Sequence, residues 1–488
     1  MNKKLKILYV SSEMDPFVKT GGLADVAGAL PKTIAHENCD IRVVIPKYSA
    51  IDEKYKKDMK HVVDHSVHLD WRTQESSVFE YDYKEQEQDK ELKCYFIGND
   101  YYFDRWNVYG EYDDAERFGF FARAVLEMLP KIGFQPDIIH CNDWQTGIIC
   151  LLLNDQYKFD EFYTNMKTVF SIHNMRYQGN FPAEVLNIIG LNHGYNNPDS
   201  IEFYGGISYM KAGLKYADII TTVSGTYAKE IQMVEYGYGM DGLIRKRNDA
   251  LYGIINGVDY KKFNPEVDKN IYENYNKDSL NIKKHNKERL QEELGLPKRD
   301  VPMIGFASRL TEQKGMRLID EAMEDLMSLD IQLVLVGTGE WHFEEMFRYM
   351  QSRWPEKVSA NIKFDEPLAQ KIQAASDMYL VPSLFEPCGL TQLYAYKYGS
   401  VPIVRKTGGL ADTVWHYNLH EKSGTGFTFD NYNSWEMMNT IKYAVDVYNN
   451  YQGDWIELVR KNMDMDFSWT SSAKKYIALY KKISQDNK

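Results

Sequence analysis

A seven-residue sequence occurs twice in this chain of 488 residues, once near each end. Residues 19–25 and 406–412 both read KTGGLAD, and each copy follows a short apolar run and precedes a helical pattern. A Gly-Gly turn between a buried strand and a helix brings backbone N–H groups and a partly positive helix end toward a ligand. The duplication therefore predicts two nucleotide-binding halves that face one anionic ligand. The alternative is a pair of ordinary tight turns.

Strand and helix patterns alternate on both sides of a polar stretch at residues 259–300. Before it, strands are predicted at 5–11, 41–45, 138–141, 168–172, 219–223 and 251–255, with short alternating strands between 67 and 97 that read as an antiparallel insertion. After it, strands at 303–307, 332–336, 378–381 and 401–404 alternate with helices at 316–327, 341–350, 368–375, 389–398 and 409–416. This alternation is typical of parallel, doubly wound sheets. We predict an α/β protein with two Rossmann-like domains and a deep cleft between them.

Composition excludes several classes of partner. The net charge of −12 argues against a nucleic-acid or membrane-surface binder. No apolar run is long enough to span a bilayer, and the run after the N-terminal lysines is too short for a secretory signal. Five cysteines without a CxxC pair indicate a reducing compartment. We therefore expect a cytoplasmic protein without nucleic-acid or membrane partners, whose oligomeric state the sequence leaves open.

Reactive side chains follow several predicted strands, where such sheets bind ligands. Arg309 and Lys314 come after the strand at 303–307, and two cations beside a helix start suit a diphosphate. The alternative is a solvated basic loop. Glu386 follows the strand at 378–381, where a carboxylate could accept hydrogen bonds from sugar hydroxyls or stabilise developing positive charge. The alternative is a carboxylate that only interacts favourably with the dipole of the following helix.

His173 and Asp143 also follow predicted strands. Their positions after buried strands favour a role in the active site, but a structural role is about as well supported. A lone His is commonly structural, and Asp143 has a competing role as a helix N-cap. His61, His65 and His68 resemble a metal pattern, but they run into alternating strands and lack an HExxH motif. We predict no metal site there.

Six segments together resemble the bacterial glycogen synthases and plant starch synthases: KTGGLADVAGALP, IHNMRYQG, GIINGVD, SRLTEQKG, PSLFEPCGLTQLYAYKYG and RKTGGLADTV. They occur in the order found in that family, between residues 19 and 414. The resemblance implies a GT-B fold and retaining transfer of glucose from ADP-glucose to the non-reducing 4-hydroxyl of an α-1,4-glucan, such as glycogen or a maltooligosaccharide. It implies no metal and no other cofactor.

The resemblance also implies domain boundaries and site residues. The first domain covers 1–257 and is joined by a returning C-terminal helix at 468–488, while the second covers 258–467. The implied catalytic residues are Glu386, His173, Arg309, Lys314 and Asp143. The implied donor-binding residues are Lys19, Gly21, Gly22, Asn256, Arg309, Lys314, Phe364, Cys388, Gly389, Leu390, Thr391, Gly408 and Gly409. Tyr394 departs from the wider retaining GT-B class, which often has a second Glu there, so the donor ribose contact stays open.

The predicted fold is also compatible with other activities. The nearest is a UDP-glucose-dependent GT-B transferase with a small acceptor, against which the KTGGLAD opening counts. A sugar-nucleotide epimerase, a phosphorylase and a non-catalytic glucan-binding protein are further alternatives. The intact set of Lys19, Arg309, Lys314 and Glu386 argues against a silent binding protein. The sequence does not distinguish a glycogen from a more starch-like product.

Overall fold

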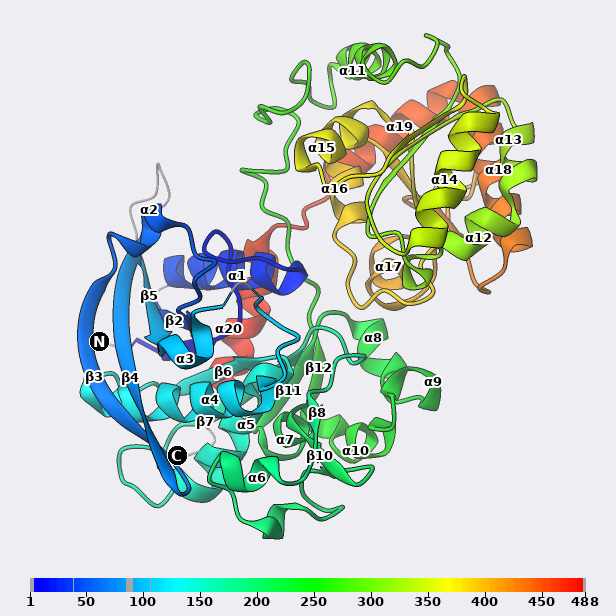
Figure 1. Ribbon diagram of the computed structural model, residues 1–488. Helices are drawn as coiled ribbons and strands as arrows, with labels where there is room; N and C mark the ends of the chain where they lie inside the picture. The colour runs from blue at the N-terminus through cyan, green and yellow to red at the C-terminus, as the bar shows by residue number, and fades with distance from the viewer. Residues whose placement is uncertain (1–3, 38, 85–90, 106, 486–488) are drawn as a thin grey trace. The chain divides into compact units, whose positions relative to one another are not determined.

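The computed structural model describes residues 4–37, 39–84, 91–105 and 107–485. The chain forms two compact units (Figure 1). Unit 1 comprises Met1–Val223, Ala228–Gly257 and Trp469–Lys488, and unit 2 comprises Ser224–Tyr227 and Val258–Ser468. Apart from the short segment Ser224–Tyr227, the chain enters unit 2 after Gly257 and returns to unit 1 at Trp469.

Unit 1 is built on a nine-stranded sheet in the order β12-β11-β7-β6-β1-β2-β5-β4-β3. The strands are β1 Lys6–Val10, β2 Asp40–Pro46, β3 Lys60–Leu69, β4 Arg72–Tyr83, β5 Leu92–Gly98, β6 Ile138–Asn142, β7 Lys167–Ile172, β11 Ile219–Thr222 and β12 Leu251–Gly253. The predicted strands of this half end within two residues of the observed ones. The apolar runs of the inner strands are buried, as expected for a parallel sheet covered on both faces, whereas the edge strand β12 is partly exposed.

The strands between residues 60 and 98 differ from the predicted insertion. β3 and β4 form a long antiparallel hairpin, but β5 pairs parallel with β2 as well as antiparallel with β4. The whole segment therefore extends the main sheet. The burial of Cys94, Tyr95, Phe96 and Ile97 in succession explains this, because an inner strand is covered on both faces.

Helices wind away from β1 in two directions. The chain moves from β1 to β2 through α1 (Gly22–His36), and from β6 to β7, β11 and β12 through α5 (Trp144–Leu152) and α7 (Tyr209–Tyr216). The remaining helices of the unit are α2 Glu53–Lys56, α3 Asp100–Phe103, α4 Asp114–Lys131, α6 Val185–Ile188, α9 Val234–Gly237 and α10 Asp241–Lys246; α8, Gly225–Glu230, starts in unit 2 and runs into unit 1. A small sheet is formed by β8 Asn180–Phe181, β9 Glu202–Phe203 and β10 Gly206–Ser208. The direction of winding reverses between β1 and β6, which makes their carboxyl ends a topological switch point.

The C-terminal helix α20, Trp469–Gln485, belongs to unit 1 and packs beside α1 (Figure 1). The Tyr480 hydroxyl lies 2.6 Å from His140 Nδ1 of β6, and the Ser472 hydroxyl donates to the Ile255 carbonyl at 2.5 Å. Gly257 lies so close to the Trp469 backbone that a Cβ would overlap it. Buried polar contacts therefore fix this helix against the sheet.

Unit 2 has a six-stranded parallel sheet in the order β15-β14-β13-β16-β17-β18. The strands are β13 Met303–Ala307, β14 Gln332–Val336, β15 Val358–Asn361, β16 Met378–Val381, β17 Val401–Arg405 and β18 Phe427–Phe429. The sequence patterns miss β15 and β18, which are short edge strands of four and three residues. Here the direction of winding reverses between β13 and β16, which creates a second switch point.

The helices of unit 2 enclose a core that contains side chains such as Phe306, Leu335, Leu380 and Ile403. They are α11 Leu280–Glu293, α12 Met316–Glu321, α13 Met323–Ser328, α14 Trp341–Arg353, α15 Glu366–Ala375, α16 Thr391–Lys397, α17 Gly408–Thr413, α18 Ser434–Asn450 and α19 Gln452–Met463.

Three predicted helices of unit 2 differ from the observed ones. The helix at 316–327 is interrupted at Ala322, whose backbone has φ −102° and ψ 8°. The helix predicted from residue 389 starts at Thr391, because Gly389 has φ +68°. The helix predicted to reach residue 416 ends at Thr413, since Val414 is extended.

Within the described residues, we find no helix with the combination of length and apolar character that crossing a bilayer requires.

Candidate functional site

Both switch points carry the reactive side chains that the sequence singled out. In unit 1, β1 leads to the first KTGGLAD segment and β6 leads to Asp143. In unit 2, β13 leads to Arg309 and Lys314, and β16 leads to Glu386. The carboxyl ends of strands at a switch point are where open α/β sheets bind ligands. Each unit therefore has one half-site.

The basic loop of unit 2 runs from the end of β13 to the start of α12. Gly315 ends a short 3₁₀ turn at 312–314 with φ +82°, and a Cβ there would overlap the Pro382 carbonyl. The Leu384 N–H donates to the Gln313 carbonyl at 2.9 Å, which ties the loop to the one after β16. Arg309 is exposed, and no acceptor in the described ranges of the chain pairs with its guanidinium. The loop holds one cation toward solvent and the other toward Glu386.

Lys314 and Glu386 form a close ion pair. Lys314 Nζ lies 2.6 Å from Glu386 Oε2, and the Ser383 hydroxyl donates to the same oxygen at 3.0 Å. The side chains are 20% and 9% exposed, so the pair is largely removed from water. A pair in such a setting is stronger than a surface pair, and removing one partner leaves a poorly solvated charge.

The second Gly-Gly turn lies directly against the Glu386 segment. Gly408 has φ +45°, and a Cβ there would overlap the Glu386 carbonyl, while one at Gly409 would overlap the Cys388 carbonyl. The Gly409 N–H donates to the carbonyls of Glu386 and Pro387, both at 3.1 Å. The expectation that this N–H is bare and directed at a ligand is therefore wrong. Because a close backbone approach consumes it, the glycines instead position the Glu386 loop.

A cavity of about 130 Å³ opens at the unit 2 switch point. Its lining includes Arg309, Lys314, Ser383 and Thr391. Gly389 and Leu390 are partly buried beside this wall, and Cys388 is buried. The cavity brings the two cations and the loop after β16 to one small volume.

Two aromatic residues of unit 2 have different surroundings. Phe364 follows β15 and is 88% exposed, so the structure leaves it on the surface of unit 2. Tyr394 stacks on Phe263, with ring centroids 3.9 Å apart and an interplanar angle of 11°. Where a second Glu would provide a carboxylate, this chain therefore places a stacked ring.

A buried carboxylate holds the first KTGGLAD loop of unit 1. Glu13, 2% exposed, accepts hydrogen bonds from the Thr20 N–H at 2.6 Å and the Thr20 hydroxyl at 2.7 Å. Burial raises the pKa of Glu13, and hydrogen bonds from Thr20 and Gly21 oppose that rise. Lys19 lies outside this anchor and pairs with Asp25 at 2.6 Å. Around Gly21 and Gly22 the space that a Cβ would occupy is open.

Asp143 has an unusual backbone and a buried carboxylate. Its φ of +56° with ψ −179° is rare for a residue with a Cβ. The His173 N–H donates to its Oδ1 at 2.8 Å, and the side chain makes no capping bond to α5. Burial raises its pKa to about 7, despite hydrogen bonds from the backbone of His173 and Asn174 and with a small contribution from Glu13. Asp143 therefore occupies the N-cap position of α5 by its backbone, as the alternative expects, but its carboxylate does not cap the helix and instead joins β6 to the end of β7.

The neighbouring His173 is neutral at pH 7, since burial lowers its pKa to about 4. Its Nε2 lies 3.0 Å from Asn142 Oδ1, which also accepts the Tyr9 hydroxyl at 2.9 Å. The Asn142 amide nitrogen donates to the Val10 carbonyl at 2.9 Å, which fixes the orientation of the amide. Nε2 therefore carries the proton, and Nδ1 of the ring is the acceptor.

Asn256 lies at the edge of unit 1, just before the chain enters unit 2. It is 6% exposed, and its Oδ1 has no hydrogen-bond partner among the described residues. A buried acceptor without a partner is costly in a native structure and calls for an explanation. A donor group on a ligand would satisfy it.

Sequence reasoning missed two parts of the unit 1 half-site. One is Glu13, which the rule applied to the other strands would have found, since it follows β1. The other is the segment between β5 and α4, whose Tyr109 hydroxyl lies 2.8 Å from the Ser12 hydroxyl. A cavity of about 440 Å³ is lined by residues 16–20, Ala50 and residues 107–109.

The three histidines of β3 do not converge. His65 is buried, whereas His61 and His68 are exposed and bond to Asp64 and Thr73 respectively. Across the described segments, no group of three or more side chains has the arrangement of a metal site.

Comparison with known proteins covers nearly the whole chain. A family described as starch synthase catalytic domain matches residues 6–246, and one described as glycosyl transferases group 1 matches residues 286–461. The chain is 48% identical to a glycogen synthase of Desulforudis audaxviator, over 99% of this chain and 98% of that protein. It is 50% identical to a glycogen synthase of Clostridium beijerinckii, over 98% and 99%.

Among solved structures, the chain is similar to the catalytic domain of starch synthase IV from Arabidopsis thaliana, bound to ADP and acarbose. The TM-score is 0.90 with 33% sequence identity, over 99% of this chain and 100% of that one. A sucrose-phosphate synthase from Thermosynechococcus elongatus shares the fold, with a TM-score of 0.61 at 17% identity.

Proposed function

Because the chain belongs to the family of bacterial glycogen synthases and plant starch synthases, we propose that its half-sites transfer glucose from ADP-glucose to the non-reducing 4-hydroxyl of an α-1,4-glucan. The predicted family, GT-B fold and glycosyltransferase activity are confirmed by full-length similarity to glycogen synthases and by the starch synthase structure. The assignment of individual residues below is our proposal.

The observation that carries this assignment is the pair of cations at the unit 2 switch point. Arg309 and Lys314 line one small cavity, and Arg309 is exposed. Cleavage of the bond between glucose and diphosphate builds negative charge on the departing ADP. Cations already held in place stabilise that charge more in the transition state than in the ground state. We assign Arg309 and Lys314 to the diphosphate.

Glu386 then changes its interactions when the donor binds. Without donor it is held by Lys314 and Ser383. A diphosphate that draws on Lys314 leaves Glu386, still held by Ser383, to accept a hydrogen bond from a glucose hydroxyl or to stabilise positive charge on the sugar ring. The segment Cys388–Thr391 and the turn at Gly408 and Gly409 form the wall that fixes this carboxylate.

We assign the unit 1 half-site to the sugars and to the outer face of the donor phosphates. Lys19 is the cation of an anchored loop, and the open space around Gly21 and Gly22 leaves that loop accessible to a ligand. Asp143 and His173 offer a carboxylate and a neutral ring acceptor for hydroxyl groups. The unpartnered Asn256 Oδ1 suits a hydroxyl of the donor.

We further propose that transfer needs no metal. Lysine and arginine side chains provide the positive charge that Mg²⁺ provides in many other phosphate sites. The five buried free cysteines support a reducing, cytoplasmic compartment.

The test is a transfer assay with purified protein, in EDTA and without added divalent metal. ADP-glucose and UDP-glucose are supplied separately, each with and without a maltooligosaccharide primer. We expect primer-dependent release of ADP together with lengthening of the primer, and the α anomer at the new linkage by NMR.

Three results would contradict parts of the proposal. Turnover with UDP-glucose and a small acceptor in place of ADP-glucose and a glucan would overturn the donor and acceptor assignment. Loss of turnover in EDTA that added Mg²⁺ restores would overturn metal independence. Glucan binding without turnover of either donor would leave a binding protein.

A further inference from the structure

Gln392, in the first turn of α16, is a buried glutamine whose amide nitrogen faces three acceptors. The side chain is fully buried, and Nε2 donates to the Gly389 carbonyl at 2.9 Å and to the Cys388 carbonyl at 3.3 Å. Nε2 also donates to the Thr413 hydroxyl at 3.3 Å. Backbone carbonyls can only accept hydrogen bonds, so the nitrogen and not the oxygen of the amide must face them. Gln392 is thus oriented toward the loop that carries Glu386.

Thr413 continues these contacts to the second Gly-Gly turn. Its hydroxyl donates to the Gly409 carbonyl at 2.6 Å and accepts from Gln392. The Gly409 N–H in turn donates to the carbonyls of Glu386 and Pro387, both at 3.1 Å. The backbone from Glu386 to Gln392 closes the circuit. We call its members the hydrogen-bond ring: Glu386, Pro387, Cys388, Gly389, Gln392, Gly409 and Thr413.

The hydrogen-bond ring holds a loop that has no regular structure of its own. Residues 382–390 belong to no helix or strand. β16 leads into this loop and its neighbour β17 leads to the second Gly-Gly turn. Gly389 has φ +68°, and a Cβ there would lie 2.5 Å from Gln392 Oε1. The ring therefore joins the ends of two adjacent strands through contacts that leave no room for a larger residue at 389.

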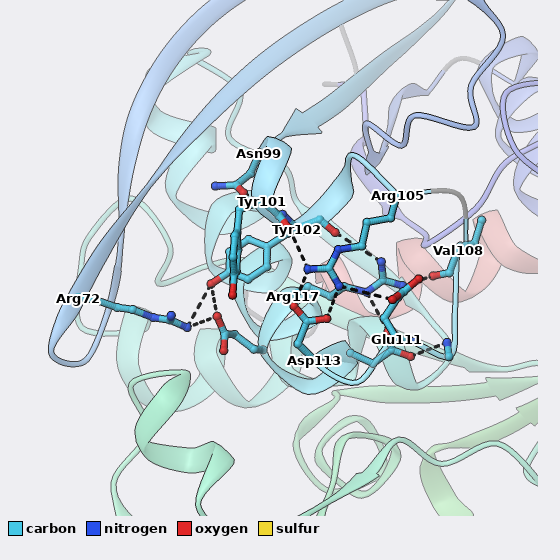
Figure 2. A network of polar contacts seen from close by, with 12 residues as sticks. Arg72, Asn99, Tyr101, Tyr102, Arg105, Val108, Glu111, Asp113 and Arg117 are labelled. Carbon is cyan, nitrogen blue, oxygen red and sulfur yellow. Dashed lines mark hydrogen bonds and ion pairs between the residues drawn. The ribbon is translucent and has the colours of Figure 1, made fainter.

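A loop of unit 1 is held by charged side chains instead. Figure 2 shows Arg105 beside Asp113, to which Nη2 donates at 2.7 Å, and Arg117, which donates to the Val108 carbonyl. The hydrogen-bond ring of unit 2 uses amide, hydroxyl and carbonyl groups, and it uses the carbonyl of Glu386 and not the carboxylate. A substitution at Gln392 or Thr413 can therefore move the loop without removing a charge from the site.

We propose that Gln392 and Thr413 are positioning residues for transfer and act by holding Glu386 in place. This rests on the proposed function. Both side chains are buried behind the loop, so their effect must pass through it. Preorganised groups stabilise a transition state only while they stay in register with the reacting atoms, and a displacement of about 1 Å can lower a rate about 10²-fold.

The proposal separates turnover from binding of the nucleotide. Arg309 and Lys314, which we assign to the diphosphate, lie on the loop after β13 and outside the hydrogen-bond ring. Loss of the ring should therefore lower kcat, because Glu386 is displaced, and should leave the affinity for ADP nearly unchanged. A loss of stability alone would not produce this separation.

The test uses Gln392→Met and Thr413→Val, which keep the size of each side chain and remove its hydrogen bonds, together with Thr413→Ser, which keeps the hydroxyl. Gln291→Met is the matched control. Gln291 of α11 is 1% exposed, and its Nε2 donates to the Arg299 carbonyl at 3.0 Å and to Gln332 Oε1 at 2.7 Å. We measure kcat and KM for transfer, the Kd for ADP by calorimetry, and stability by urea unfolding.

We expect Gln392→Met to lower kcat by about 10²-fold and Thr413→Val by about tenfold. The double variant should be no slower than Gln392→Met alone, because both substitutions open the same ring. Thr413→Ser should restore most of the loss, and Gln291→Met should keep the wild-type kcat although it also loses buried hydrogen bonds. The Kd for ADP should stay within about twofold of the wild type in every variant.

A kcat near that of the wild type in Gln392→Met and Thr413→Val would overturn the proposal. So would an equal loss in Gln291→Met, since lower stability would then explain it. Additive losses in the double variant, or equal losses in Thr413→Ser and Thr413→Val, would show that the two side chains do not act through one ring. If Gln392→Met does not fold, the pair of Thr413 variants decides the question.

Failure of the proposed function would be seen separately. A wild type that transfers no glucose would refute that function and, with it, the positioning role. Normal transfer by the wild type together with unaffected variants would refute the positioning role alone.

Discussion

Replacing Asp143 with Asn should stabilise the fold at high pH and impair transfer. Burial raises the pKa of Asp143 from 3.8 to about 7. The folded protein therefore binds more protons than the unfolded chain between these two pH values. The free energy of unfolding of the wild type must fall as pH rises through this window. An Asn at this position does not ionise, so the variant lacks that part of the pH dependence.

The size of the effect follows from the pKa shift. A shift of this size lowers the unfolding free energy of the wild type by about 4 kcal/mol above pH 7. Below pH 4 it lowers that free energy by almost nothing. Asn accepts the positive φ of this position as readily as Asp does, and its carbonyl oxygen can accept the His173 N–H. The substitution therefore adds little backbone strain of its own.

The assay is urea unfolding followed by tryptophan fluorescence at pH 5 and pH 8. Asp58→Asn, an exposed carboxylate of the same unit, is the control. We expect the stability difference between Asp143→Asn and the wild type to grow by about 2.5 kcal/mol from pH 5 to pH 8. The corresponding difference between Asp58→Asn and the wild type should change much less, because Asp58 is exposed. Equal differences at both pH values would refute the reasoning, because the carboxylate would then carry no ionisation penalty in the fold.

Three further predictions concern single contacts. Lys314→Ala should lower kcat by about 10² to 10³ and leave the thermal midpoint within a few degrees; near-normal turnover would rule out the diphosphate assignment. Glu13→Gln keeps an acceptor but removes its charge, so it should raise the KM for ADP-glucose, and Thr20→Val should add little in the double variant; additive effects would disprove the anchor. Tyr480→Phe leaves His140 Nδ1 without its partner and should cost about 1–3 kcal/mol of stability by urea unfolding, whereas an unchanged midpoint would show that α20 docks without this bond.

Strand positions were predictable from the chain because burial on both faces of a parallel sheet needs unbroken apolar runs. Ile138–Asn142 and Met378–Val381 have this pattern. The edge strand Val358–Asn361 does not, because partial exposure there tolerates polar residues. The start of α16 depends on one backbone angle, the positive φ of Gly389, which composition and periodicity do not reveal.

The candidate residues were found because they follow strands, but their partners lie far away in sequence. Lys314 and Glu386 are 72 positions apart, and β13 and β16 must be neighbours in the sheet for the two side chains to meet. Glu13 was overlooked although it obeys the same rule.

The duplicated heptapeptide separates local from long-range information. Both copies form a turn after a parallel strand and then a helix, as local propensity and two glycines dictate. Gly21 and Gly22 border open space, and Lys19 pairs with Asp25. In the second copy, Gly408 and Gly409 are covered by the Glu386 loop, which takes up the Gly409 N–H.

Identical residues therefore have different roles, because the groups around each turn come from neighbouring strands. The pairing of β16 with β17 brings the Glu386 loop onto the second turn. At the first turn, Glu13, which follows β1, accepts hydrogen bonds from Thr20 and from the Gly21 backbone, while the space that a Cβ would occupy at Gly21 and Gly22 stays open. Amino-acid order sets where the chain turns, since that depends on a few adjacent φ and ψ angles. What each turn contacts depends on which strands lie side by side in the folded sheet.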